Sequence, residues 1–183
     1  MLLLWALVLG LTVGFLRGGS IANLDYLEIR HSWLVFLALV IQLLIFPSFT
    51  SEPAVRVGTP YFYVASYGIL ALFVLFNLRT WQIAFMGFGM GSNFLVIVVN
   101  GGYMPASVGS LRHAGNNAVA DSLLNEEICG NVIRMTNSTH LNFLGDWLYL
   151  PDWMPLSTAF SLGDLLIGLG LIAFFGLGMV SKQ

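Results

Sequence analysis

Two carboxylates in a repeated triplet are the residues of this sequence best suited to chemistry. Leu144-Gly-Asp146 and Leu162-Gly-Asp164 stand 18 residues apart. Two carboxylates that meet can divide the roles of general acid and base, or hold a cation between them. A carboxylate in the first turn of a helix instead caps free N–H groups, which is the expected role of Asp164. Asp146 could close a turn in the same way, and the spacing alone does not bring the two together.

Histidines give less support for a site. His113 and His140 have acidic neighbours, and with Asn100 they could join Asp146 and Asp164 as candidate catalytic residues. A metal site needs at least a third ligand at regular spacing, and the sequence has no H-E-x-x-H or C-x-x-C pattern. The single cysteine excludes an internal disulfide. We therefore expect no metal and assign no catalytic residue firmly.

The composition indicates the kind of protein that positions these residues. Of 183 residues, 57% are hydrophobic and 9% are charged, and the mean hydropathy is +0.84. A soluble domain carries about 25% charged residues because water must wet its surface. The apolar residues also form long unbroken blocks, which indicates a lipid environment. The net charge of −2 gives no reason to expect a nucleic-acid partner.

Five apolar blocks predict an all-α integral membrane bundle of about five transmembrane helices, in a single domain over residues 1–183. The predicted helices cover residues 1–16, 32–46, 61–76, 81–99 and 161–180. Several are nearer 16 than 20 residues, so flanking residues must complete each span. The first block lacks the basic start and the cleavage site of a signal peptide, so we expect it to be retained.

Lysine and arginine positions predict the orientation. With the N-terminus outside, the inner segments are very short and carry Arg17, Arg30, Arg79 and Lys182. The outer segments then carry Arg56, Arg112 and Arg134, mostly in one long loop where the rule has little force. We expect the N-terminus outside and the C-terminus in the cytoplasm.

The long outer loop, residues 100–158, is expected to be structured. Short helices are predicted around residues 107–113 and 118–128, the second with Leu123, Leu124 and Ile128 on its apolar face. A polar turn follows at residues 136–139. Residues 141–155 are predicted to form a segment at the membrane interface, where aromatic side chains such as those of Trp147, Tyr149 and Trp153 are favoured.

Small and polar residues inside the spans predict helix packing. Close approach of helices is expected at Gly10, Gly14, Gly87 and Gly91, and interhelical hydrogen bonds at Gln42, Gln82 and Asn93. No Asp, Glu, Lys or Arg stands at the middle of a predicted span. That pattern argues against a proton relay or a charge-coupled transporter.

Several motifs in one order resemble a bacterial family of small multi-pass membrane proteins classed as a domain of unknown function. They are Arg17-Gly18-Gly19, then Asn100-Gly101-Gly102-x-Met104-Pro105, then Leu144-Gly145-Asp146, and lastly Ser161-Leu-Gly163-Asp164. The resemblance extends over nearly the whole chain. It implies a bacterial plasma membrane location and five helices, and it implies no activity.

Three functions are compatible with these features. The favoured hypothesis is a non-enzymatic accessory or scaffold subunit that packs with membrane lipids and other integral membrane subunits in a larger complex. With 14% aromatic residues, such a subunit of a respiratory or photosynthetic complex could also hold a quinone, carotenoid or chlorin. The second hypothesis is a membrane-embedded enzyme that acts on a lipid or isoprenoid at the outer face, and the third is a small transporter.

Overall fold

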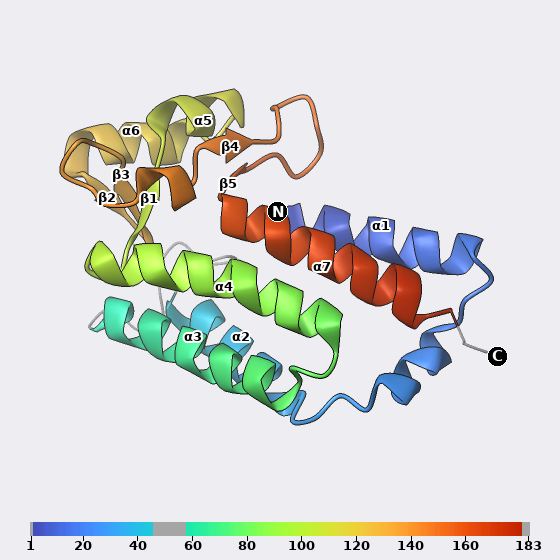
Figure 1. Cartoon of the computed structure of the whole chain (residues 1–183). Helices are drawn as coiled ribbons and strands as arrows, with labels where there is room; N and C mark the ends of the chain where they lie inside the picture. The colour runs from blue at the N-terminus through green and yellow to red at the C-terminus, as the bar shows by residue number, and fades with distance from the viewer. Residues whose placement is uncertain (1, 46–57, 181–183) are drawn as a thin grey trace.

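The computed structural model describes residues 2–45 and 58–180 of the chain. Its main elements are five long helices: α1 (Leu2–Leu16), α2 (Trp33–Ile45), α3 (Thr59–Phe76), α4 (Trp81–Val99) and α7 (Leu162–Gly178) (Figure 1). Their ends lie within two residues of the predicted blocks wherever those ends are described. Residue 46, the predicted end of the second block, lies outside the described residues. The mostly helical fold class is confirmed.

The long helices follow one another in a row whose order differs from their order in the sequence. In the order α1, α7, α4, α3, α2, each helix makes its main contacts with the next in the row (Figure 1). Thus α1 and α2, which are neighbours in the sequence, stand at opposite ends of the row. Their connection, which contains the 3-10 helix η1 (Ile21–Leu27), therefore crosses one end of the row.

Hydrogen bonds fix this connection to the ends of two other helices. Ser20 N–H and the Asn23 Nδ2 amide both donate to the Met179 carbonyl, each at 2.8 Å. Further along, the buried Asn77 amide brackets the Arg30 backbone: Arg30 N–H donates to Asn77 Oδ1 at 2.7 Å, and Asn77 Nδ2 donates to Arg30 O at 2.8 Å. The arginines Arg17, Arg30 and Arg79 all lie at this end of the row, which we call the arginine end.

Glycines let α1 approach α7 closely. A Cβ atom on Gly10 would lie 3.1 Å from Ile172 Cα, and one on Gly14 would lie 3.0 Å from Phe175 O. Both distances are shorter than ordinary side-chain contacts, so the absence of a side chain at these two positions is what permits the contact.

The other predicted packing residues divide into two groups. Gly87 packs against Val74 of α3, and Gln42 Nε2 donates to Ser66 Oγ across α2 and α3 at 3.0 Å. Among the described residues, no atom lies within 4 Å of the place where a Cβ of Gly91 would stand, so the structure shows no helix packed against this position. Gln82 is buried but makes no hydrogen bond to a neighbouring helix among the described residues, which corrects its predicted role.

Residues 100–161 fold over the other end of the row, and we call this segment the cap. It contains α5 (Val108–His113), α6 (Asn117–Glu126) and η2 (Asn142–Leu144). It also contains strands that the sequence did not predict: β1 (Met104–Ala106), β2 (Ile128–Cys129) and β3 (Val132–Arg134) in the order β1-β3-β2, and a pair β4 (Leu148–Tyr149) and β5 (Ala159–Phe160).

The cap has its own small core under α5 and α6. Ala106, Leu111, Ala120 and Leu123 are buried together there. Leu124 is 46% exposed and Ile128 belongs to β2, so the predicted apolar face of one continuous helix is wrong beyond Leu123. Because α6 ends at Glu126, Ile128 leaves the helical repeat and enters the strand.

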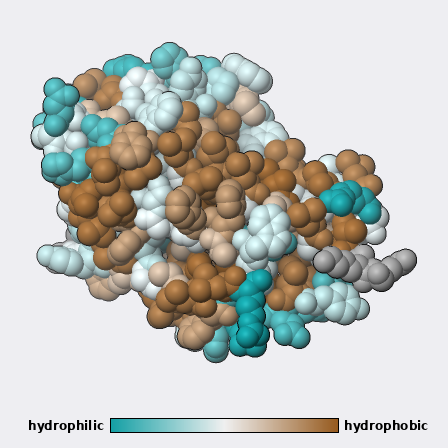
Figure 2. All heavy atoms as spheres, viewed as in Figure 1, coloured by the Kyte–Doolittle hydropathy of each residue, from teal (hydrophilic) through white to brown (hydrophobic). Residues whose placement is uncertain are grey.

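By length and composition, one helix of the described residues, α4, is long and apolar enough to cross a membrane. Helices α1 and η1 pass the same test as a pair bent by 100°, while α2, α7 and most of α3 (Pro60–Phe76) are apolar but shorter. Figure 2 shows hydrophobic side chains over the sides of the helices and hydrophilic ones mainly over the cap and at the helix ends. The hydrophobic surface thus coincides with the apolar blocks of the sequence, and the hydrophilic surface with the segments between them.

Candidate functional site

The first turn of α7 is organised by Ser161 and Asp164. Ser161 Oγ accepts the Asp164 N–H at 2.9 Å, and Asp164 Oδ2 accepts the Ser161 N–H at 3.1 Å. This reciprocal pair is a capping box, which satisfies two N–H groups that the helix cannot satisfy internally. The second Leu-Gly-Asp triplet therefore begins a helix.

The Asn93 side chain connects this capping box to α4. The residue is 2% exposed, and its side chain donates from Nδ2 to Asp164 Oδ1 at 2.8 Å and accepts at Oδ1 from Ser161 Oγ at 2.8 Å. Gly163 leaves room for the amide, because a Cβ there would meet Asn93 Oδ1. Polar groups of three residues thus connect α4 and α7 within an apolar interface.

Asp146 is held over this site by backbone hydrogen bonds to β1. Its N–H donates to Pro105 O at 2.8 Å, and its carbonyl accepts the Ser107 N–H at 2.9 Å. The residue is half-buried, but its Oδ1 is fully buried and has no hydrogen-bond partner among the described residues. Burial, and secondly the nearby charge of Asp164, raise the pKa of the Asp146 carboxyl well above its usual value.

The structure therefore brings the two aspartates within electrostatic range of each other. We call Asn93, Asp146, Ser161 and Asp164 the aspartate cluster. Asp164 accepts hydrogen bonds from the Asn93 amide and the Ser161 N–H, whereas burial of Asp146 favours the protonated form of its carboxyl. A buried carboxyl group with a raised pKa can act as a general acid. Among the described residues, no three His, Cys, Asp or Glu side chains are arranged to hold a metal ion.

The other candidate catalytic residues have structural contacts instead. Asn100 accepts the His140 N–H at 2.8 Å and donates to His140 O at 2.9 Å, so it fastens the end of α4 to the cap. His113 stacks on Tyr149 with ring centroids 4.9 Å apart, and one of its ring nitrogens lies 2.7 Å from Gly109 O. No contact among the described residues joins either imidazole ring to the aspartate cluster.

The glycine-rich motifs lie at both ends of the row. At the cap end, Gly101 and Gly102 adopt positive φ angles of 70° and 95°, which glycine tolerates best. Met104 and Pro105 are buried in β1, and a Cβ on Gly145 would lie 2.5 Å from Pro105 O. These residues shape the backbone that carries Asp146.

The motif Arg17-Gly18-Gly19 lies at the arginine end, away from the aspartate cluster. Gly18 has a positive φ of 74°, and a Cβ on Gly19 would lie 2.6 Å from Met179 O. The two glycines therefore turn the chain after α1 and let it pass close to the end of α7.

Sequence reasoning did not predict the capping role of Ser161 or the presence of two tyrosines near this site. Ser161 stands three residues before an acid at the start of an apolar block, a capping signal that could have been used. Tyr63 and Tyr67 of α3 also lie within electrostatic range of both aspartates, and their rings meet edge to face at 5.3 Å. Their spacing of four residues places them on one helix face.

Comparison with known proteins assigns the chain to a family. A family model described as a family of unknown function (DUF5317) matches residues 26–176. The chain belongs to DUF5317. The DUF5317 match begins in η1 and ends in α7, so it includes the whole aspartate cluster and leaves α1 outside. No curated protein matches the chain, and no solved structure matches it.

Proposed function

We propose that the chain is a bacterial plasma membrane protein that crosses the bilayer five times, with α1, α2, α3, α4 and α7 as spans. The observation that carries the proposal is the exposed apolar surface of the row. Large apolar side chains stand exposed on every long helix, among them Phe15, Phe36, Leu39, Leu72, Phe88, Leu95 and Leu169. Soluble monomers rarely expose apolar patches this extensive, whereas lipid covers them.

The tryptophans support the same placement. Trp5, Trp147 and Trp153 lie at the cap end, with Trp5 Nε1 donating to Pro155 O at 2.9 Å. Trp33 and Trp81 begin α2 and α4 at the arginine end. Two belts of tryptophan, one at each end of the helices, are typical of the two membrane interfaces.

Arginine positions support an outer cap. Three arginines lie at the arginine end in short connections, where the positive-inside rule has most force. The cap carries Arg112 and Arg134, each paired with an acid, Asp121 and Glu127 respectively, at 2.8 Å. We therefore place the cap and the N-terminus outside and the C-terminus in the cytoplasm.

Cysteine labelling in intact cells tests this topology. The native Cys129 is replaced by serine, and Asn125→Cys in the cap or Leu78→Cys between α3 and α4 is added, both at exposed positions. We expect a membrane-impermeant maleimide to label Asn125→Cys in intact cells and Leu78→Cys only after permeabilisation. Equal labelling of both without permeabilisation would contradict the proposed topology.

We further propose that the protein is a non-enzymatic subunit of a larger membrane complex. Large apolar side chains remain exposed on every long helix of the described residues, and these surfaces suit helices of other subunits as well as lipid. Exposed aromatic rings such as Phe88, at 73%, could also lie against a quinone, carotenoid or chlorin. Asp164 is already engaged by the capping box and Asn93, which supports a structural use of the aspartate cluster.

Co-purification tests this role. Extraction from the native membrane in mild detergent should yield the chain together with other integral membrane proteins, identified by mass spectrometry, and an absorption spectrum would reveal a bound pigment. A chain that is alone, monomeric and colourless would contradict the subunit role.

An enzyme that acts on a lipid or isoprenoid at the outer face is the alternative. The unpartnered Oδ1 of Asp146 beside Asp164 favours it, since a buried carboxyl that holds a proton can act as a general acid. Purification of the chain alone, with an activity that Asp146→Asn abolishes, would favour this alternative over the subunit. A small transporter has less support, because the described spans carry no ionisable Asp, Glu, Lys or Arg near their middle.

A further inference from the structure

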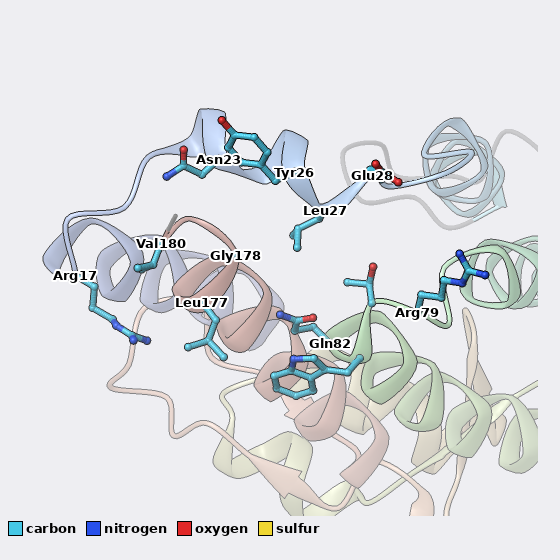
Figure 3. Close-up of a pocket in the computed structure, with 12 residues that line it drawn as sticks. Arg17, Asn23, Tyr26, Leu27, Glu28, Arg79, Gln82, Leu177, Gly178 and Val180 are labelled. Atoms are coloured by element: carbon cyan, nitrogen blue, oxygen red, sulfur yellow. The ribbon is translucent and has the colours of Figure 1, made fainter. Parts of the chain in front are cut away.

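A furrow crosses the arginine end between η1 and the start of α4 (Figure 3). It consists of two cavities of about 920 Å³ and about 400 Å³, both of which are lined by Leu27, Glu28, Arg79 and Thr80. Because they share these residues, the cavities adjoin. We call them together the arginine furrow. It lies at the opposite end of the row from the aspartate cluster and has no part in the capping of α7.

The furrow has an excess of positive charge. Arg17 lines the larger cavity, Arg30 the smaller one, and Arg79 both. All three arginines are exposed, and none of them has an ion pair with another described residue. Among the lining residues that the structure describes, Glu28 is the one acid. Guanidinium groups that no protein carboxylate neutralises are suited to bind a phosphate.

Gln82 adds a polar group directed into the furrow. The residue as a whole is 5% exposed, and its side chain has no hydrogen-bond partner among the described residues. In Figure 3 it lies between Leu177 and the residues that precede α4. Because Gln82 lines the larger cavity, its amide is available to bond an occupant of the furrow. The furrow is the space from which a ligand could supply that bond.

The start of α4 faces the same space. Thr80 is the N-cap residue, but its side chain makes no capping hydrogen bond. The N–H groups of Ile83 and Ala84 donate to the Thr80 carbonyl, so those of Trp81 and Gln82 remain available, together with the positive end of the helix dipole. Arginines, an unpartnered amide and a helix N-terminus at one place all favour an anionic oxygen ligand.

The remaining walls are apolar and open towards the outside of the row. Leu177, Val180 and Trp81 line the larger cavity, and Trp81 is 55% and Leu177 41% exposed. An occupant could therefore place a polar head among the arginines and an apolar chain along α4 and α7. A soluble phosphate compound would leave these apolar walls unused.

We propose that the arginine furrow binds the phosphate-bearing head group of an anionic lipid of the inner leaflet. The inference rests on the proposed membrane topology, which places the arginine end at the cytoplasmic interface. Basic pockets between spans on that side are suited to anionic head groups. The phosphate is common to lipids and to soluble phosphate compounds, and the apolar walls favour the lipid.

Native mass spectrometry of the full chain in detergent micelles tests the proposal, with phosphatidylglycerol and phosphatidylcholine as probes. We expect phosphatidylglycerol to remain bound in preference to phosphatidylcholine. Arg79→Gln and Gln82→Glu should each weaken phosphatidylglycerol binding about tenfold, as expected for the loss of one charge-assisted hydrogen bond or the gain of a repelling charge. Arg112→Gln, which removes an arginine of the cap, is the matched control and should bind like the wild type.

Three results would overturn the proposal. One is equal binding of the two lipids, and another is binding by Arg79→Gln and Gln82→Glu that equals that of Arg112→Gln. The third is displacement of phosphatidylglycerol by excess inorganic phosphate, which would assign the furrow to a soluble phosphate compound. Circular dichroism of each variant identifies any that fails to fold. If either Arg79→Gln or Gln82→Glu does not fold, lipid binding by the other variant tests the proposal.

Failure of the lipid proposal is distinguishable from failure of the membrane topology. If the chain is not an integral membrane protein, alkaline carbonate will release it from membranes without detergent. If only the furrow is misassigned, the chain stays in the membrane pellet and the variants bind lipid as the wild type does.

Discussion

Replacing Gly163 by alanine should strongly destabilise the protein, although the change adds a single methyl group. A Cβ at this position would meet Asn93 Oδ1 and lie 2.6 Å from the Gly89 carbonyl oxygen of α4. The carbonyl belongs to a helix backbone and cannot rotate away, so α4 and α7 must separate. Asn93 would then lose its bonds to Ser161 and Asp164. We expect a loss of roughly 2 to 4 kcal/mol in the free energy of unfolding, from overpacking and lost buried hydrogen bonds.

Gly91→Ala is the matched control for this prediction, because it adds the same methyl group to α4 where no atom lies within 4 Å. Alanine favours a helix over glycine by about 0.8 to 1 kcal/mol, so Gly91→Ala should be neutral or slightly stabilising. Unfolding of both variants by sodium dodecyl sulfate, followed by far-ultraviolet circular dichroism, measures the difference. Equal stability of the two variants would show that α4 and α7 do not meet at Gly163.

The positions of the long helices could be predicted because they depend on local sequence. Each apolar block ends at residues that stop a helix or attract water, such as Gly18 after α1 and Asn100 after α4. The capping role of Asp164 is local too, because the residues involved stand three positions apart. The order of the helices in the row is different. It depends on contacts between distant segments, and five similar apolar blocks carry no signal for which one neighbours which.

The position of Asp146 within electrostatic range of Asp164 could not be predicted for the same reason. It depends on Asp146 pairing through its backbone with β1, about forty residues earlier in the chain.

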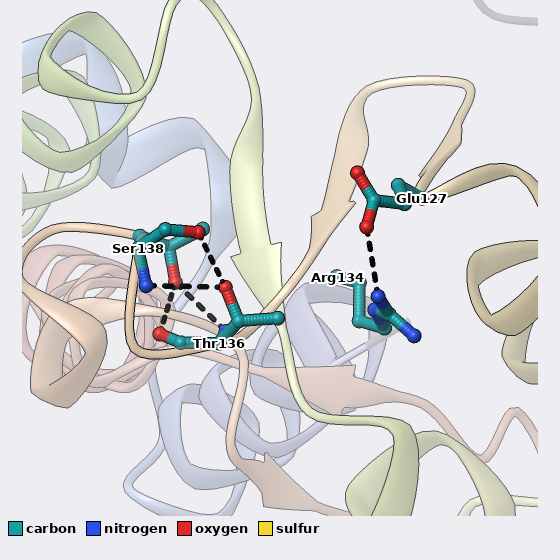
Figure 4. Close-up of polar contacts among 5 residues, drawn as sticks. Glu127, Arg134, Thr136 and Ser138 are labelled. Atoms are coloured by element: carbon teal, nitrogen blue, oxygen red, sulfur yellow. Dashed lines mark hydrogen bonds and ion pairs between the residues drawn. The ribbon is translucent and has the colours of Figure 1, made fainter.

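The cap strands are two or three residues long, too short for an alternating pattern to be visible. Figure 4 shows how polar contacts hold this part of the cap: Arg134 pairs with Glu127 at 2.8 Å, and Thr136 Oγ1 lies 2.8 Å from Ser138 Oγ. The predicted polar turn is present, but no pattern in the sequence indicates that the preceding residues form a hairpin.

Asp146→Asn should remove much of the pH dependence of stability. Burial, and secondly Asp164, raise the pKa of the Asp146 carboxyl well above its ordinary value, so the folded chain binds this proton more tightly than the unfolded chain. Below the unfolded-state pKa, about 4, the carboxyl is protonated in both states. As the pH rises from there through the folded-state pKa, the unfolded chain releases the proton first and the free energy of unfolding falls. The contribution of Asp146 to stability is therefore present in acid and lost towards neutral pH.

Denaturation curves at several pH values from about 4 to 8 measure this effect, with the lower bound set by the ordinary carboxyl pKa. Wild type should become less stable across the range, and Asp146→Asn should show a flatter profile. Asp152→Asn, which removes an exposed carboxylate from the same cap, should keep the wild-type profile. In Asp164→Asn the decrease in the free energy of unfolding should end at a lower pH than in wild type, because the substitution removes the neighbouring charge that helps to raise the pKa of Asp146. If Asp146→Asn and wild type have the same profile, Asp146 is hydrated or paired in the folded protein, and the aspartate cluster offers no carboxyl group suited to act as a general acid.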